Sequence, residues 1–513
     1  MPSLAATLSD LLPRDADLRR SILFFGIVGL VLTAGLATLL SIWHVLVIVL
    51  SGFFLLLTIK RPRWILTFLA VWVPLEPFLL KFVPDEIYIY ARYFSEGLIY
   101  MLALTVVLRA SLGEKRLKQS PLDLPFVLFL LVLIAGAVMN AVPTHIAFLG
   151  IRQIIRFVLL FFIVVFLYPP REYIRRLTVL MFGVVLLEAG LGIAQGFIGA
   201  PADEFLIPSE RKFYESIQLT SGTTQFWDPG SRVFATMGRY DQLGTFLAFF
   251  LLLAIGFLYE RDSREDRNRL GLILAVGIPA LLLTYSRSSW FGFLIGFLLI
   301  GMWFMRDRRV LVGFLLFCGM VAGYLGYSGI IVPALTEETG RQTVAERFFE
   351  AFSYERWRGE FFGLGRLYWM VQTPRIVVRA SPLFGLGPGQ FGGGAAAALG
   401  NTRAYDALGL PFGVYGTEGY IDNNWFSLLG ETGFLGLAFY LWMYGALYLA
   451  ARRVFHWSTD PLTRGLALGF MGALVAVALN AFLATFLEVR TLALYLWLYG
   501  AFIVVLGRRE KII

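Results

Sequence analysis

Long apolar segments recur along the whole chain and are separated by short polar stretches rich in arginine. Each apolar segment is near the length of about 20 residues that an α-helix needs to cross a bilayer. A membrane β-barrel would instead alternate apolar and polar positions over segments of about 10 residues, and the sequence lacks that pattern. The pattern therefore predicts an all-α polytopic membrane protein.

About fourteen spans are predicted, and the charges between them test that count. The spans lie near residues 21–40, 43–59, 64–82, 94–110, 122–142, 146–168, 174–198, 241–259, 270–285, 288–305, 310–332, 423–450, 465–485 and 489–507. Basic clusters lie at 19–20, 60–63, 115–118, 171–176, 261–269, 306–309, 452–453 and 508–511. With fourteen alternating spans every cluster falls on one side, which the positive-inside rule identifies as the cytoplasm, together with both termini. Residues 21–40 are then a retained first span rather than a cleaved signal.

Composition narrows the class of protein. The chain has 513 residues, of which 58% are hydrophobic and 15% are charged, whereas an ordinary soluble domain carries about 25% charged residues. This excludes a soluble enzyme, a disordered protein and a nucleic-acid binder. The net charge of +9 follows from the basic cytoplasmic segments, so we expect membrane lipids and no nucleic acid as partners.

Two long connections leave the membrane on the other side, at residues 199–240 and 333–422. Long connections in a compact protein are usually functional or disordered. The second one has the aromatic and helical pattern of a folded, partly helical loop, for example at Phe348, Trp357 and Trp369. We treat residues 1–513 as one integral membrane domain, with 199–240 as a first periplasmic loop and 333–422 as a large one.

Arg152 and Arg156 are the most informative charges, because they lie inside the predicted sixth span on one helix face. A charge at the centre of a bilayer costs about 2.5–3.5 kcal/mol on insertion scales. Something anionic should therefore face them. Glu76 and Glu188, in two other predicted spans, are candidates for a structural ion pair, and the functional alternative is an anionic ligand that enters from the outer side.

Further arginines are predicted on the same outer face. They are Arg232 and Arg239 before the eighth span, Arg287 beside Ser286 in a hairpin tip, and Arg366, Arg375 and Arg379 in a helix of the large loop. A snorkelling arginine at a hairpin tip is common, but the flanking hydroxyl groups favour an anion site. Arginine binds phosphate through a planar bidentate fork, so an outward-facing anion pocket is the simplest use of these residues.

Metal chemistry is not indicated by the sequence. The single cysteine, Cys318, lies in an apolar segment, and the three histidines are far apart in sequence. An intrachain disulfide is impossible and a histidine or cysteine metal cluster is not expected. We expect no metal and no cofactor.

Asp422 and Asn423 open the predicted twelfth span, just after the large loop. Aspartate and asparagine are preferred as helix caps, and a carboxylate at the rim of an arginine-lined pocket is also a candidate general base. Both interpretations of Asp422 stay open, and His145 is a further candidate base. Glu431 lies inside the same span and needs a partner.

Seven motifs occur in a fixed order. They are Gly192-Ile193-Ala194-Gln195-Gly196, Arg232-Val233-Phe234-Ala235-Thr236, Thr284-Tyr285-Ser286-Arg287, Gly365-Arg366, Pro382-Leu383-Phe384-Gly385-Leu386-Gly387-Pro388-Gly389, Asp422-Asn423, and Glu431-Thr432-Gly433-Phe434-Leu435-Gly436. This ordered set resembles the O-antigen ligase and O-antigen polymerase superfamily, which are bacterial inner-membrane glycosyltransferases of the periplasmic face. Two positions depart from the family pattern: Asp422 replaces its histidine, and its asparagine before the eighth span is replaced near Asp241-Gln242.

The resemblance implies a reaction and a set of site residues. The donor would be an undecaprenyl-diphosphate-linked glycan, and the acceptor a glycan or a lipid-linked glycan. Its diphosphate would be held without metal by Arg152, Arg156, Arg232, Arg287 and Arg366, supported by Ser286 and Glu431. Asp422 and Asn423 would be catalytic, the transfer would invert the anomeric centre, and the large loop would cover the site.

Other classes of protein remain to be weighed against this one. A lipid-linked oligosaccharide flippase or another transporter would also bind a diphosphate lipid through buried arginines, but it would need sites that face both sides. A peptidoglycan polymerase of the shape, elongation, division and sporulation family is a second alternative, against which the ordered motifs argue. The motifs do not separate a ligase from a polymerase.

Overall fold

The computed structural model describes residues 41–113, 119–208, 213–214, 217–218, 230–260, 263–327, 344–412, 414 and 421–513. Within these residues the protein is all-α, apart from a two-residue antiparallel pairing of β1 (Phe213–Tyr214) with β2 (Ile217–Gln218). The predicted helical class is therefore confirmed. The predicted span 21–40 and the basic clusters at 19–20 and 115–118 lie outside the described residues.

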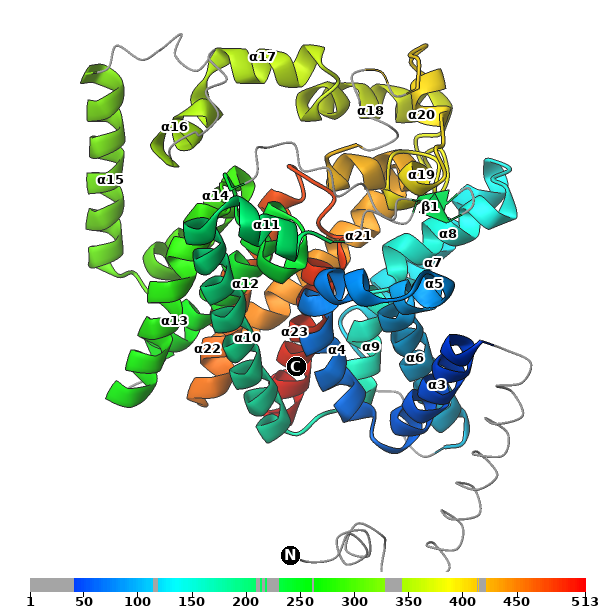
Figure 1. Ribbon diagram of the computed structural model, residues 1–513, viewed down its shortest axis with the longest axis horizontal. Helices are drawn as coiled ribbons and strands as arrows, with labels where there is room; N and C mark the ends of the chain where they lie inside the picture. The colour runs from blue at the N-terminus through cyan, green and yellow to red at the C-terminus, as the bar shows by residue number, and fades with distance from the viewer. Residues whose placement is uncertain are drawn as a thin grey trace, which may run out of the picture.

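Long helices follow the apolar segments of the sequence. They are α3 (Ile42–Lys60), α4 (Pro62–Leu79), α6 (Phe94–Ser111), α7 (Asp123–Met139), α8 (Thr144–Ile155), α9 (Val158–Leu167), α10 (Arg171–Ile198), α12 (Tyr240–Glu260), α13 (Arg264–Leu283), α14 (Arg287–Leu298) with its π-helical continuation η4 (Leu299–Phe304), α15 (Arg308–Tyr327), α21 (Asn424–Trp457), α22 (Pro461–Asn480) and α23 (Arg490–Arg509). Figure 1 shows them as one bundle, with α15 at its side.

Among the described residues, nine helices are long and apolar enough to cross a membrane, or ten if α8 and α9, which are bent by 54°, form one span. The predicted count of fourteen is thus not confirmed. The helix α7 has only 17 residues, and α13 begins with a charged segment at 264–269, so both fall short of the length or apolarity of a full span.

An ion pair and a hydrogen bond place two of the basic helix ends on one side of the bundle. Arg171, at the start of α10, pairs with Asp460, which caps α22. Arg509, at the end of α23, donates to the carbonyl of Pro169, between α9 and α10, at 3.0 Å. This grouping agrees with the common side predicted for the basic clusters.

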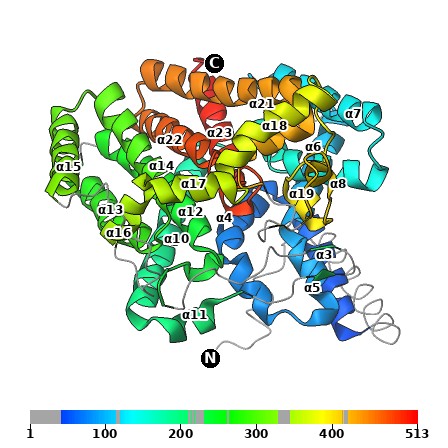
Figure 2. The same cartoon turned by 90° about the horizontal axis from the view of Figure 1, so that it is seen from above.

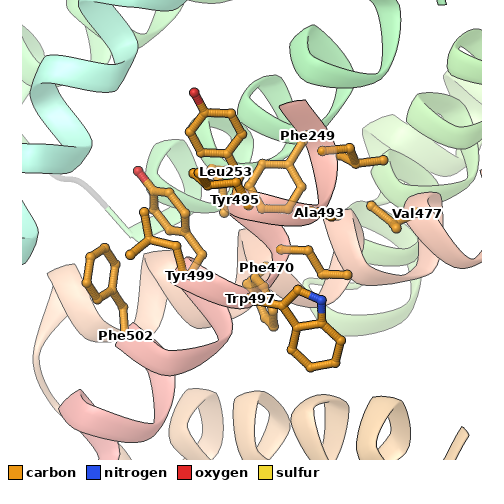
Figure 3. Packing of buried hydrophobic residues seen from close by; sticks show 14 of the residues in the cluster. Phe249, Leu253, Phe470, Val477, Ala493, Tyr495, Trp497, Tyr499 and Phe502 are labelled. Carbon is orange, nitrogen blue, oxygen red and sulfur yellow. The ribbon is translucent and has the colours of Figure 1, made fainter. Parts of the chain in front are cut away.

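The core of the bundle lies around α12, α22 and α23. Phe249 of α12 packs edge-to-face against Tyr499 of α23 and Phe470 of α22, and Trp497 is fully buried beside them (Figure 3). The helices α12 and α22 approach closely at Gly256, where any side chain would overlap the backbone of α22. Small residues at such a crossing let two apolar helices pack backbone to backbone.

Short helices lie over the end of the bundle opposite the basic helix ends (Figures 1 and 2). They are η1 (Leu80–Phe82), η2 (Asp85–Ile87), α5 (Tyr88–Arg92), α11 (Ala200–Leu206), η3 (Ala235–Met237), α16 (Val344–Phe349), η5 (Glu350–Phe352), α17 (Tyr354–Phe362), α18 (Arg366–Ala380), α19 (Gly394–Ala398) and α20 (Arg403–Asp406). Seen from above, α17 and α18 cross the bundle, and α18 packs against α21. Helices therefore occupy the predicted large loop.

Candidate functional site

A group of arginines lies where these covering helices meet the ends of α12, α14 and α21. Its six arginines are Arg232, Arg239, Arg287, Arg347, Arg356 and Arg366, and its four carboxylates are Asp241, Glu350, Glu360 and Asp422. We refer to it as the loop-side cluster. Because the guanidinium groups outnumber the carboxylates, the cluster keeps an excess of positive charge.

Glu350 joins two arginines of the cluster. Its carboxylate lies 3.1 Å from Nη1 of Arg287 and accepts a hydrogen bond of 2.6 Å from Nη1 of Arg347. Burial by itself would raise the pKa of Glu350, but Arg287 and Arg347 outweigh it and hold the pKa below its ordinary value. The carboxylate is therefore ionised at neutral pH and occupies a position suited to an anion.

The Ser286-Arg287 hairpin presents Arg287 to this cluster. The turn before it places Tyr285 in the left-handed region, with φ of 52°, and α14 begins at Arg287 itself. The hydroxyl of the buried Ser286 lies 2.8 Å from that of Ser289 and 3.2 Å from that of Ser288. These hydroxyl contacts lie in the first turn of α14, and the supporting role of Ser286 stays a prediction.

Arg232 is held in place by a buried glutamine. The side-chain oxygen of Gln195 accepts hydrogen bonds from the backbone of Phe234, at 2.9 Å, and of Ala235, at 2.8 Å. Arg232 lies over the ring of Tyr240 at 4.6 Å, and burial lowers the pKa of its guanidinium. The glutamine motif in α10 therefore fixes the segment that carries Arg232.

Arg366 connects the cluster to the start of α21. Its guanidinium lies 3.3 Å from the Glu360 carboxylate and 3.6 Å from that of Asp422, and its Nε is buried with no hydrogen-bond partner in the described part of the chain. Arg239 makes two hydrogen bonds of 3.1 Å to Asp241. The pKa of Arg239 is raised, chiefly by Asp241 and also by Asp422.

Asp422 and its neighbour Asn423 have different roles in the structure. The side chain of Asp422 is 59% exposed, whereas Asn423 is fully buried and caps α21 by accepting a hydrogen bond from the backbone of Phe426 at 3.2 Å. The interpretation of Asp422 as the helix cap is therefore wrong. Because Asn423 makes the cap, the carboxylate of Asp422 is left to pair with Arg366.

Glu431 holds a glycine-rich segment against a break in α21. The helix is interrupted at Gly433, which has φ of 66°, and residues 385–389 run against that break. The backbone of Leu386 donates to the carbonyl of Gly430 at 2.8 Å. The buried carboxylate of Glu431 accepts from the backbone of Gly389 at 2.9 Å, which is the partner that its position in a span required. The glycine-rich motif at 382–389 and the motif that begins at Glu431 are therefore packed together and joined by hydrogen bonds.

Arg152 and Arg156 form a separate site with Glu96. Nη2 of Arg152 and Nη1 of Arg156 donate to the same carboxylate oxygen of Glu96, at 2.6 and 3.2 Å. Arg156 also donates to the carbonyl of Glu488 at 2.8 Å. All three charged side chains are largely buried. We refer to Arg152 and Arg156, together with Glu96 that they share, as the α8 pair.

The prediction that Glu76 or Glu188 faces these arginines is wrong. Glu76 accepts hydrogen bonds from Ser95, at 3.0 Å, and from Arg490. Glu188 accepts one of 2.6 Å from the hydroxyl of Thr236. Each of the two carboxylates already has a closer donor on another segment, so neither is left for α8.

The α8 pair and the loop-side cluster are joined by a short piece of chain. Asn424, two residues after Asp422, donates to the carboxylate of Glu488 at 3.4 Å and accepts from the backbone of Leu487 at 2.6 Å. His145, the other candidate base, is exposed in the first turn of α8. Its side chain has no hydrogen-bond partner within the ranges that the structure describes.

Five residues of these sites were not among the predicted ones: Glu96, Arg347, Glu350, Arg356 and Glu360. Glu96 is an ionisable residue inside a predicted span, which is a signal of function or buried pairing. The others lie among many charged residues of the large loop, where spacing alone does not single them out.

Comparisons with known proteins bear on the same region. Residues 270–441 match the family model described as O-antigen ligase, and no curated protein matches the chain. The match includes Ser286, Arg287, Glu350, Arg366 and Asp422, while the α8 pair lies outside it. It confirms the resemblance to the O-antigen ligase superfamily that the ordered motifs indicate.

Proposed function

Because residues 270–441 match the O-antigen ligase family, we propose that this membrane protein is a glycosyltransferase of the ligase or polymerase type. It would move a glycan from an undecaprenyl-diphosphate donor to a glycan or lipid-linked acceptor. The observation that carries this proposal is the loop-side cluster, in which Arg366 pairs with the exposed carboxylate of Asp422 and Arg287 meets that of Glu350.

The loop-side cluster suits a diphosphate. Guanidinium groups bind phosphate oxygens through charge-assisted, often bidentate hydrogen bonds. The buried Nε of Arg366 and the excess of guanidinium groups over carboxylates supply donors and charge for such a ligand. As the glycosyl bond breaks, negative charge grows on the leaving diphosphate, and donors already fixed at that position lower the barrier.

The transfer itself needs one proton acceptor. The acceptor hydroxyl attacks the anomeric carbon on the face opposite the diphosphate, a new C–O bond forms, and the bond to the diphosphate oxygen breaks with inversion. Asp422 takes the hydroxyl proton, and the diphosphate leaves with the bonding electrons, held by Arg232, Arg287 and Arg366. Asn423 is buried, so we assign it a positioning role: by capping α21 it fixes the place of Asp422.

Arg152 and Arg156 enter this proposal as positioning residues as well. Their charges already meet the carboxylate of Glu96 and the carbonyl of Glu488. They would join α8 to the segment before α23, which in turn contacts Asn424 through Glu488. In this way they would support the start of α21, on which Asp422 depends, rather than contact the diphosphate.

The membrane orientation follows from the same arrangement. The loop-side cluster lies at the end of the bundle away from the basic helix ends. If the basic ends are cytoplasmic, as the positive-inside rule requires, the cluster faces the periplasm of a bacterial inner membrane. A lipid-linked donor would then reach it from the outer leaflet, with the large loop covering its sugars.

Transfer by the purified full chain in lipid nanodiscs tests the proposal. The assay supplies an undecaprenyl-diphosphate oligosaccharide with either a lipid A-core acceptor or a second donor molecule, and the productive acceptor separates a ligase from a polymerase. Arg287→Lys keeps the charge but removes the fork, so we expect about 100-fold slower transfer. Arg358→Lys, an exposed change on α17, is the matched control. Normal turnover by Arg287→Lys would refute the assignment of Arg287 as a diphosphate-binding residue.

A further inference from the structure

A second basic site lies on the other side of α18, away from the loop-side cluster residues described above. It is a cavity of about 410 Å³ between α18 and α20. Arg375, Arg379 and Arg403 line it together with Gln372, Ile376 and Leu386. The proposed transfer reaction uses none of these side chains.

Three guanidinium groups face this cavity. Among the residues that the structure describes, the side chains of Arg375, Arg379 and Arg403 have no hydrogen-bond or ion-pair partner. Arg375 and Arg379 are also four residues apart on one helix, where like charges repel. The one carboxylate in the lining, Asp406, accepts a hydrogen bond of 2.8 Å from Thr402 within α20. The cavity therefore carries an excess of positive charge that an anion would neutralise.

Apart from Gln372, the other side chains that line the cavity are aliphatic. Ile376 and Leu386 are buried, and Leu408 packs against the same small core. A site that combines guanidinium forks with an aliphatic floor suits a ligand with an oxyanion on one edge and C–H groups on a face. A sugar ring that bears a carboxylate or phosphate has this chemistry, and Gln372 can add a hydrogen bond to its hydroxyl groups.

The cavity is also linked to the proposed active site. Leu386, in its wall, donates its backbone N–H to the carbonyl of Gly430 in α21, and α18 carries Arg366 at its start and Arg379 at its end. A glycan that occupies the cavity would therefore lie against α18, which carries Arg366, and against a segment that is hydrogen-bonded to α21.

We propose that this cavity binds an acidic sugar residue, one with a carboxylate or phosphate group, in the glycan that the protein transfers or extends. This rests on the proposed function for the identity of the glycan, while the binding site rests on the geometry of Arg375, Arg379 and Arg403. Arg379 and Arg403 would bind the oxyanion, and Ile376 and Leu386 would contact the ring.

Direct binding tests the proposal without the transfer reaction. The purified full chain is titrated calorimetrically with glucuronic acid, galacturonic acid, glucose 6-phosphate and, as a neutral control, glucose. We expect at least one acidic sugar to bind and glucose not to bind under the same conditions. The double variant Arg379→Gln/Arg403→Gln should weaken that binding at least tenfold, which corresponds to the loss of charge-assisted hydrogen bonds. Arg358→Gln, an exposed arginine on α17, should leave it unchanged.

Three results would overturn the assignment: no binding of any acidic sugar, equal binding by the double variant, or equal weakening by Arg358→Gln. A competition experiment repeats the sugar titration in the presence of inorganic phosphate, and in nanodiscs with or without phosphatidylglycerol. If either competes as strongly as the acidic sugars, the cavity is a general oxyanion or headgroup site and the sugar assignment fails. Since no donor is present, these outcomes are independent of whether the chain transfers glycans.

Discussion

The α8 pair and the loop-side cluster both hold arginines that share carboxylates, but the two sites differ in their access to solvent. Arg152 and Arg156 share the carboxylate of Glu96, and Arg156 also contacts a backbone carbonyl. In the loop-side cluster, Arg287 and Arg366 meet carboxylates that they share with further arginines.

The difference lies in access to solvent. Glu96 is only 4% exposed and Arg156 only 7%, so the α8 pair is closed to solvent. Asp422 is 59% exposed, and Arg366 beside it 29%. An arginine inside a membrane protein is therefore not in itself a sign of ligand binding. Both sites have more guanidinium groups than carboxylates, so solvent access is what separates the proposed binding site from the buried ion pair.

Asp422 offers the largest test of this comparison. Asp422→Asn removes the proposed proton acceptor, and we expect transfer to fall by at least about 100-fold, within the range typical of general-base catalysis. The protein should reach normal levels, because Asn423 and not Asp422 caps α21. Transfer in nanodiscs and the amount of purified protein are the two measurements.

Glu355→Gln is the matched control for Asp422→Asn, since Glu355 is an exposed carboxylate on α17. Transfer by Asp422→Asn at the rate of this control would refute the catalytic assignment. His145 would then be the next residue to replace.

Replacing a member of the α8 pair should reduce the stability of the protein rather than the rate of transfer alone. Arg156→Gln leaves Glu96 with one fewer partner in a buried site, and breaking a buried ion pair typically destabilises by about 3–5 kcal/mol. We expect a lower melting temperature and less protein in the membrane. Adding Glu96→Gln leaves the largely buried Arg152 without its carboxylate and should lower the stability further.

This pair of variants also separates the two arginine sites. If the Arg156→Gln protein is stable but inactive, Arg156 contacts the ligand and is not only a positioning residue. Full stability of Arg156→Gln, with or without Glu96→Gln, would show that the ion pair does not support the fold.

The sequence predicts the class of fold and part of the site for identifiable physical reasons. Apolar segments near 20 residues predicted the membrane helices, but nothing between Ile155 and Val158 signals the 54° bend that breaks α8 from α9. The ordered motifs predicted Arg287, Arg366 and Asp422 on one side. Which carboxylate each arginine meets depends on tertiary packing, and for that reason Glu96 was missed while Glu76 was expected.

A smaller effect should come from Glu350, which occupies an anion position between Arg287 and Arg347. Its pKa is held below the ordinary value, so it is ionised at neutral pH and would compete with the diphosphate. Glu350→Gln should therefore lower the KM for the donor several-fold, a change on the order of 1 kcal/mol for one lost charge contact. A raised KM with unchanged kcat would instead show that Glu350 orients Arg287 for the ligand.

Chelation should have the smallest effect of all. Diphosphate chemistry needs positive charge near the leaving group, which a divalent cation or fixed guanidinium groups can supply. In the loop-side cluster Arg232, Arg287 and Arg366 would supply it, so the transfer rate in excess EDTA should equal the rate without EDTA. The comparison becomes sharper with Arg287→Gln: magnesium should not restore its activity, because a cation would compete with the remaining guanidinium groups for the same phosphate oxygens. Loss of wild-type activity in EDTA and its specific recovery with magnesium or manganese would show that the arginines act beside a metal ion and not in place of one.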